Sequence, residues 1–260
     1  MNGLGFLKRF WQALPFSDQT RWRSTALMLE PLLPFIRGSV VHTAYLREKE
    51  WQTRRLRPFD GDALPVLPHQ ERTDVLMLGI IDWRFRIQRP QHIARALADT
   101  GHRVFYVSTA FVNARTPGFE LECLDDAGRL HNVRLHMKGG SLVQADPPSP
   151  DHIGRLDASM ATLLKWVSSR QMIAIVLHPY WHDLAVKLPA DRLIYDCMDF
   201  HGGFGNTGLG LAALEQALMR EAAAVVTTSL PLYDIATAYN PHVRLIRNGA
   251  DYALFSARPG

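Results

Sequence analysis

The loop that follows the first strongly apolar segment of the chain is rich in arginine. It runs from Ile81 to His92 and contains Arg84, Arg86 and Arg89, with no glycine. A loop that cradles a dinucleotide needs glycines so that the backbone can approach the pyrophosphate, which argues against an NAD enzyme. Guanidinium groups beside the start of a helix can instead bind an anion.

We expect this loop to be functional, because it lies where open α/β sheets hold their ligands. The alternative is a solvated basic loop. Arg84, Arg86, Arg89 and His92 are the residues that we assign to substrate binding in the loop. Since the arginines follow a buried strand in a turn, we expect their substitution to change stability by no more than about 0.5 kcal/mol.

A second cluster, Leu177–His182, reads LHPYWH and follows a buried-type strand. Its histidines, His178 or His182, could donate hydrogen bonds to a sugar hydroxyl. Its aromatic rings, Tyr180 or Trp181, could stack on a sugar face. The alternative is that the aromatic rings complete the core.

A third cluster places Asp196 and Asp199 between a strand and a Gly-rich loop. Asp196 could bind an acceptor hydroxyl, or it could accept hydrogen bonds from loop amides and order the turn. The spacing suits neither a calcium loop nor a two-metal site, so we expect no metal. Glu215 is expected to brace a neighbouring element, and Ser229 to cap a helix N-terminus.

The elements that position these clusters alternate between strand and helix. The pattern predicts an α/β fold with a doubly wound, mostly parallel Rossmann-like sheet. We expect strands at 74–81, 103–108, 119–124, 132–137, 172–177, 192–196, 223–229 and 243–247. We expect helices at 90–100, 149–170, 181–187, 209–220 and 230–239.

The chain divides by composition into an N-terminal segment and a larger domain. Residues 1–57 read as a helical, basic leader, residues 58–72 as a proline-containing linker, and residues 73–256 as the α/β domain. Residues 1–60 hold ten Lys/Arg against five Asp/Glu, although the whole chain has a net charge of only +4. The leader either binds an anionic membrane surface or packs as an amphipathic helix pair.

Bulk properties indicate a globular protein with an ordinary core. The composition is 47% hydrophobic and 21% charged, with two cysteines. The chain has no apolar run of the roughly 18 residues that span a membrane and no signal-peptide pattern. We therefore expect a cytoplasmic protein, peripheral on the inner face of the plasma membrane if the leader binds lipid, with no nucleic-acid partner.

Two segments of the sequence resemble one family of enzymes. The first is Trp83-x5-Arg-Pro-Gln-His92-x4-Leu-Ala-x2-Gly-His-x-Val104. The second is the Tyr-Asp-x2-Asp segment at 195–199, followed by a helix with Glu215 and a strand ending in Ser229. In this order they are similar to the N-terminal domain of family-4-like retaining glycosyltransferases of the GT-B fold, a family that builds bacterial surface polysaccharides.

The resemblance extends to the end of the chain. Asn248, Gly249 and Asp251 match the segment that ends the first domain in that family, and residues 257–260 match the start of an interdomain linker. Asn and Gly tolerate the left-handed backbone of a sharp turn, so we expect a turn and a hinge here. A second, donor-binding domain follows in the family, and we expect none of it within residues 1–260.

The resemblance implies the acceptor-side half of a glycosyltransferase. The enzyme would move a sugar, with retention, from a nucleotide-sugar donor to a saccharide or lipid-linked acceptor, without a cofactor or a metal. His178 and Asp196 are assigned as catalytic residues, and Tyr180 is assigned to substrate binding. This chain alone is expected to be inactive. The alternatives are a non-catalytic Rossmann-like module that binds a partner glycosyltransferase or membrane, and a fragment of a GT-B-fold sugar-nucleotide epimerase.

Overall fold

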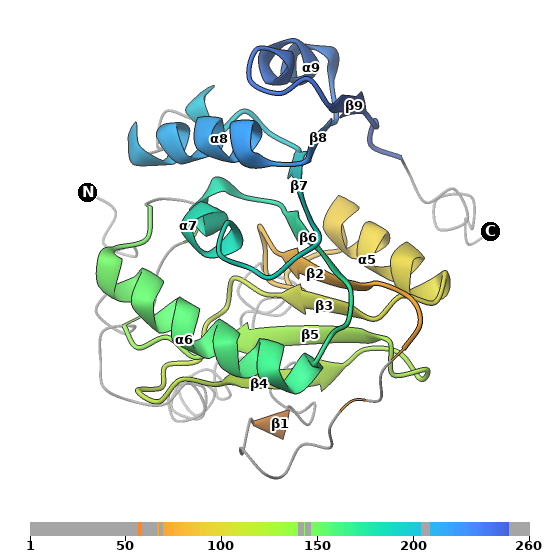
Figure 1. The fold of residues 1–260 in the computed structure, drawn as a ribbon, viewed down its shortest axis with the longest axis vertical. Helices are drawn as coiled ribbons and strands as arrows, with labels where there is room; N and C mark the ends of the chain where they lie inside the picture. The colour runs from red at the N-terminus through yellow and green to blue at the C-terminus, as the bar shows by residue number, and fades with distance from the viewer. Residues whose placement is uncertain are drawn as a thin grey trace, which may run out of the picture.

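The computed structural model describes residues 57–58, 67, 70–139, 143, 147–203 and 209–249. In this part the chain forms one nine-stranded sheet with helices on both faces (Figure 1). The expected helical leader before residue 57, Asp251 and residues 257–260 lie outside the described residues.

The sheet has the strand order β1-β4-β5-β3-β2-β6-β7-β8-β9. The strands are β1 (Arg57–Pro58), β2 (Asp74–Leu78), β3 (Val104–Val107), β4 (Phe119–Cys123), β5 (Leu130–Leu135), β6 (Met172–Val176), β7 (Arg192–Cys197), β8 (Ala224–Thr227) and β9 (Val243–Leu245). Only β4 pairs antiparallel with its neighbours β1 and β5, and all the other pairs are parallel. The expected doubly wound, mostly parallel sheet is confirmed.

The strand order reverses at the centre of the sheet. The chain passes from β2 outward to β3 on one side and later returns to β6 on the other side of β2. In open α/β sheets, ligands bind outside the carboxyl ends of the strands at such a reversal. The loops after β2 and β6 therefore flank the expected binding edge.

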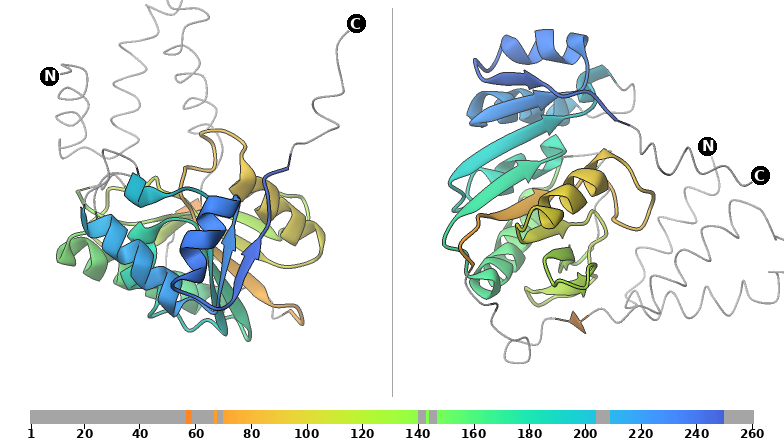
Figure 2. Two further views of the ribbon diagram at one scale, coloured as in Figure 1. Left: turned by 90° about the horizontal axis from the view of Figure 1, so that it is seen from above. Right: turned by 90° about the vertical axis from the view of Figure 1, so that its right-hand side faces the viewer.

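The helices divide between the two faces of the sheet (Figures 1 and 2). They are α5 (Arg89–Asp99), α6 (Pro150–Val167), α7 (His182–Ala185), α8 (Leu209–Glu221) and α9 (Leu230–Thr237). Helix α5 packs with Val75 and Met77 of β2 on one face, and α6, α7 and α8 contribute to the larger core on the other, with Leu76 and Leu78. Because β2 is covered on both faces, all five of its residues are buried, which explains why the four residues after Asp74 are apolar.

The predicted strands and helices are found within a few residues of their expected ends. The short helix expected near residues 181–187 is a 3-10 turn, η2 (Pro179–Trp181), followed by α7. Arg57 and Pro58 lie at the expected boundary between the leader and the linker, and they pair with Leu121 and Glu120 of β4. The sheet thus includes a short piece of the chain that precedes the 73–256 domain.

Candidate functional site

The loop after β2 begins with a tight, hydrogen-bonded turn. Gly79 leaves no room for a side chain, since an added Cβ would lie 2.7 Å from the Val107 carbonyl oxygen. Asp82 then accepts hydrogen bonds from the Ser108 hydroxyl (2.7 Å) and from the backbone N–H of Arg84 (2.7 Å). Asp82 and Ser108 are ordering residues that the sequence analysis missed. An Asp side chain that accepts from the backbone N–H two residues later is typical of such a turn, and Asp82 does this with Arg84.

The arginines of the loop have different environments. Arg84 is partly buried and forms an ion pair with the buried Glu122 of β4. Arg86 is exposed, and its guanidinium carbon lies 5.0 Å from the centroid of the Phe85 ring. His92, on the first turns of α5, is also exposed. Arg86 and His92 are therefore the two predicted binding residues of this loop that face solvent.

Arg89 connects three elements, α5, β7 and the segment after β9, at the edge of the sheet where the parallel strands end, which we call the carboxyl edge. Its Nε lies 3.0 Å from Oδ2 of Asp196, and its Nη2 lies 3.0 Å from Oδ1 of the same carboxylate. Its Nη1 donates to the backbone oxygen of Ile246 (3.1 Å), just after β9. The side chains of Arg89 and Asp196 are only 12% and 4% exposed. The expectation that Arg89 lies in an exposed turn is corrected: it is the first residue of α5, and it is bound to β7.

Asp196 does not order its own loop by accepting amide hydrogen bonds, because its carboxylate receives the Arg89 guanidinium. Burial raises the pKa of the Asp196 carboxyl, and the hydrogen bonds and charge of Arg89 offset part of that rise. A buried carboxylate is costly unless it is paired. The pair therefore keeps both charged groups in place at the centre of the carboxyl edge.

The start of α5 depends on Gln91 and Pro90. Gln91 is fully buried; its Oε1 accepts from the Gln88 backbone N–H (3.0 Å), and its Nε2 donates to the Trp83 carbonyl (3.4 Å). Pro90 lies in the first turn, where its missing N–H costs nothing. Trp83 is buried against Tyr106. Most of the Trp…Arg-Pro-Gln segment that carries the family resemblance is thus used to hold this loop on the sheet.

The loop after β6 is buried. His178 is 1% exposed; its Nδ1 accepts from the Tyr180 backbone N–H (3.1 Å), and its ring lies 4.4 Å from that of His201. Burial lowers the pKa of His178 to about 3, with a smaller contribution from His201. His178 is therefore a neutral helix cap, and its ring packs against the loop after β7.

Tyr180 and Trp181 lie in the core rather than on the surface. Tyr180 is 1% exposed, and both rings contact Phe111. The indole N–H of Trp181 donates to the Gly79 carbonyl (2.7 Å), which ties the loop after β6 to the loop after β2. Packing is the alternative that the geometry favours for these rings, since neither can stack on a sugar in this conformation.

The two secondary expectations for the β7–β9 side agree with the structure. Glu215 of α8 is buried and accepts a hydrogen bond from the Tyr195 hydroxyl (3.0 Å), so it braces α8 against β7. Ser229 is the N-cap of α9 and accepts from the Leu232 backbone N–H (3.4 Å).

The described part of the chain ends at Gly249, within the segment where an Asn-Gly turn is expected. Residues 246–249 carry no turn, and neither Asn248 nor Gly249 has a positive φ. The Ile246 N–H donates to the Thr227 carbonyl (2.8 Å), and the Ile246 oxygen accepts from Arg89. These bonds hold Ile246 to β8 and to α5, and the hinge expected at Asn248, Gly249 and Asp251 stays a prediction.

Large apolar side chains are exposed around the carboxyl edge. Five of the six large hydrophobic residues that are exposed in the described part follow the ends of β2, β7, β8 or β9. They are Phe85, Ile87, Phe200, Leu230 and Ile246. We call this set the edge patch. These side chains follow strand ends at one edge of the sheet, where they are available for contact with another apolar surface.

The described residues contain no group of three or more His, Cys, Asp or Glu side chains that could hold a metal ion. None of the helices in the described ranges is long and apolar enough to cross a membrane.

Comparisons with known proteins find similarity among solved structures only, and that similarity is distant. No family model and no curated protein matches the sequence. Among solved structures, the chain is similar to the catalytic domain of starch synthase IV from Arabidopsis thaliana bound to ADP and acarbose, with 11% identity and a TM-score of 0.46. The match covers 70% of this chain and 52% of that one, so the chain spans about half the length of the structure it matches. The described residues themselves form a doubly wound α/β domain, a fold that serves many functions.

Proposed function

We propose that this chain is the acceptor-side half of a two-domain retaining glycosyltransferase of the GT-B fold. The full enzyme would move a sugar from a nucleotide-sugar donor to a saccharide or lipid-linked acceptor. The resemblance of residues 83–104 and 195–229 to family-4-like enzymes suggested this function. The edge patch is the structural observation that supports this proposed function.

The edge patch lies where such an enzyme needs a second surface. Phe85 and Ile87 follow β2, and Phe200, Leu230 and Ile246 follow strands on the other side of the reversal. A ligand at this edge of the sheet would be open to water on one side. A second domain that packed against the patch would cover the apolar side chains and exclude water from the ligand, which strengthens electrostatic contacts.

Two exposed basic residues are suited to contact a ligand in that cleft. Arg86 offers a guanidinium group, and His92 lies near the start of α5. Both can donate to the oxygens of a phosphate or to an acceptor hydroxyl. Arg89 and Asp196 are proposed as positioning residues, because their charged groups are used in contacts within the protein.

His178 and Asp196 were assigned to acceptor hydroxyls, and the geometry supports a revised role for both. His178 caps η2 from a buried position, and Asp196 holds Arg89. We therefore place the acceptor against Arg86 and His92, and we assign no nucleophile to this half. The charge of the leaving diphosphate would be offset in the second domain, and attack from the face that it vacates would give retention.

The proposal is tested by comparing this chain with the complete product of its gene. Each is incubated with a panel of UDP-, GDP- and dTDP-sugars, and released nucleotide is measured against a heat-killed control. We expect release by a longer product that carries a Glu-x7-Glu-like pattern, and none by residues 1–260. Release by residues 1–260 alone would contradict the assignment of this chain to half an enzyme.

The second candidate is a non-catalytic module that binds a partner glycosyltransferase through the edge patch. It is favoured by the same apolar side chains, because a separate protein could cover them as well as a second domain could. The gene sequence after residue 260 distinguishes the two: a stop codon supports the module.

A peripheral membrane role for residues 1–57 remains an additional expectation, with salt-sensitive binding to anionic vesicles.

A further inference from the structure

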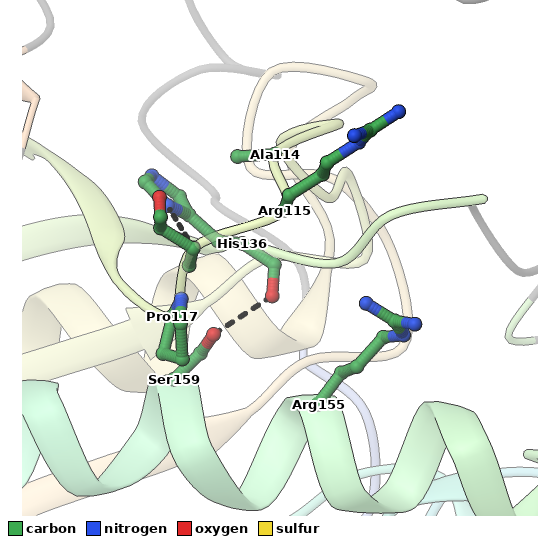
Figure 3. A pocket seen from close by; sticks show the side chains of 7 residues that line it. Ala114, Arg115, Pro117, His136, Arg155 and Ser159 are labelled. Atoms are coloured by element: carbon green, nitrogen blue, oxygen red, sulfur yellow. Dashed lines mark hydrogen bonds between the residues drawn. The ribbon is translucent and has the colours of Figure 1, made fainter.

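A basic pocket lies on the β3–β5 side of the sheet, away from the Arg89–Asp196 pair. It is hollowed between the loop after β3, the end of β5 and the first half of α6 (Figure 3). Its volume is about 180 Å³, including space that is open to solvent. The lining residues are Ala114, Arg115, Thr116, Pro117, His136, Arg155 and Ser159. We call it the α6 pocket.

The backbone of the α6 pocket is fixed by hydrogen bonds between its three elements. The Ser159 hydroxyl of α6 donates to the His136 carbonyl (2.8 Å) and accepts from the Gly118 backbone N–H (3.2 Å). The His136 backbone N–H donates to the Gly118 carbonyl (2.9 Å). Nδ1 of the His136 ring lies 3.1 Å from the Thr116 carbonyl, which can only accept, so this nitrogen carries a proton. The pocket is therefore preformed.

Two arginines bring positive charge to the α6 pocket from different elements. Arg115, on the loop, is exposed, and no described residue gives its guanidinium a hydrogen bond or an ion pair. Arg155, on α6, donates from Nε to Asp151 (2.8 Å), and within the described ranges its two terminal nitrogens have no partner. In Figure 3 both guanidinium groups extend to the same side, whereas the His136 ring lies on the other side.

The charge around the α6 pocket is mostly positive. The hydrogen bond from Arg155 lowers the pKa of Asp151, and Lys138 and His152 act on it in the same direction with smaller effects. Arg155, Lys138 and His152 therefore lie near this carboxylate, and Arg115 adds a further positive charge to the lining of the pocket. Like charges held on a rigid surface repel one another, and a bound anion relieves that repulsion.

We propose that the α6 pocket binds a phosphate group through Arg115 and Arg155. A guanidinium group offers a planar fork of N–H donors that matches the oxygens of a phosphate. Two such forks on one side of the pocket suit a ligand with several charged oxygens. Asp151 orients Arg155 through its hydrogen bond, while Lys138 contributes positive charge nearby.

The proposal also names the class of acceptor, and this part rests on the proposed glycosyltransferase function. In that enzyme the donor diphosphate belongs to the second domain. A phosphate in the α6 pocket would then belong to the acceptor, as a sugar phosphate or as the phosphate of a lipid-linked saccharide. Both sources present the same group to Arg115 and Arg155.

The test measures binding of inorganic phosphate to residues 1–260 by calorimetry at low ionic strength. We expect Arg115→Gln and Arg155→Gln together to weaken binding at least about tenfold, since each removes a charge-assisted hydrogen bond. Arg170→Gln is the matched control, because Arg170 is an exposed arginine just after the other end of α6 and its loss should leave binding unchanged. Asp151→Asn keeps an acceptor for Arg155 and removes the opposing charge, so it should tighten binding.

Thermal melts of each variant establish that it is folded. No binding to the parent chain, or equal binding by the parent and the folded double variant, would overturn the site. Glucose 1-phosphate and vesicles that contain a polyprenyl phosphate are then tested as competitors, and displacement by one of them identifies the source. Displacement by neither would overturn the acceptor assignment. The assay needs no donor and no transfer, so its outcome is independent of the nucleotide-release test.

Discussion

Two loops at the same edge of the sheet, those after β2 and β6, differ in what they offer to a ligand. The loop after β2 presents Phe85, Arg86 and Ile87 to solvent. The loop after β6 folds back as η2, with Tyr180 and Trp181 in the core and the indole bonded to Gly79. Position at a strand end therefore identifies the binding edge, but the path of each loop decides which side chains reach a ligand.

The largest effect that the comparison predicts is on stability, at Trp181. Trp181→Ala should cost about 3–5 kcal/mol, because it removes a fully buried ring and leaves a cavity. Phe85→Ala is the matched control, since it removes a ring that is half exposed. Urea denaturation followed by circular dichroism measures both. Similar losses from the two variants would mean that the two loops are equally buried in solution.

The Arg89–Asp196 pair should be the next most sensitive feature. Arg89→Ala and Asp196→Ala should each cost about 3 kcal/mol, because each leaves a buried charge without its partner. The double variant should lose clearly less stability than the sum of the two single losses, since each single change breaks the same ion pair. A double-mutant cycle in urea provides the measurement. Additive losses would show that the two residues act separately.

His178 should make the protein less stable in mild acid. Its pKa is about 3 in the folded chain, against 6.5 as its ordinary value, so the unfolded chain binds the proton first. The stability from neutral His178 is present above pH 6.5 and is lost as the pH falls toward 3. At pH 5 the loss should reach about 2 kcal/mol.

His178→Asn is the variant that isolates this effect. Asn offers an oxygen that can accept from the Tyr180 backbone N–H and does not titrate. Free energies of unfolding are measured for both proteins at pH 7.5 and pH 5. The parent should lose more stability than the variant over this range, and equal losses would show that His178 is solvated and titrates normally.

Arg86 should give the smallest change in stability and an effect on function. Arg86→Ala should alter the free energy of unfolding by no more than about 0.5 kcal/mol, as exposed substitutions usually do. In a complete enzyme, Arg86→Ala should lower the rate of sugar transfer about tenfold, which corresponds to a loss of about 1.4 kcal/mol of transition-state stabilisation. An unfolding assay and a transfer assay on the same variant test both. An unchanged rate would leave the exposed loop with no role in the cleft.

The fold could be predicted from the sequence further than the site could. The apolar run at 75–78 and Gly101 after α5 fix local structure, because burial and backbone geometry depend on neighbouring residues. The Arg89–Asp196 pair joins residues 107 positions apart, and no local pattern encodes which carboxylate meets which arginine. For Tyr180 the sequence left core packing and sugar binding open, since the same aromatic types serve both.

The short strand β1 has a consequence for the solution behaviour of the chain. Sheet edges can recruit a second molecule through their free backbone groups. Pro58 has no N–H to offer, and Arg57 carries a charge, so this pair covers part of β4 and gives little for another strand to join. A chain shortened to begin at residue 59 would uncover that part of β4. We expect such a truncated protein to be more prone to aggregation.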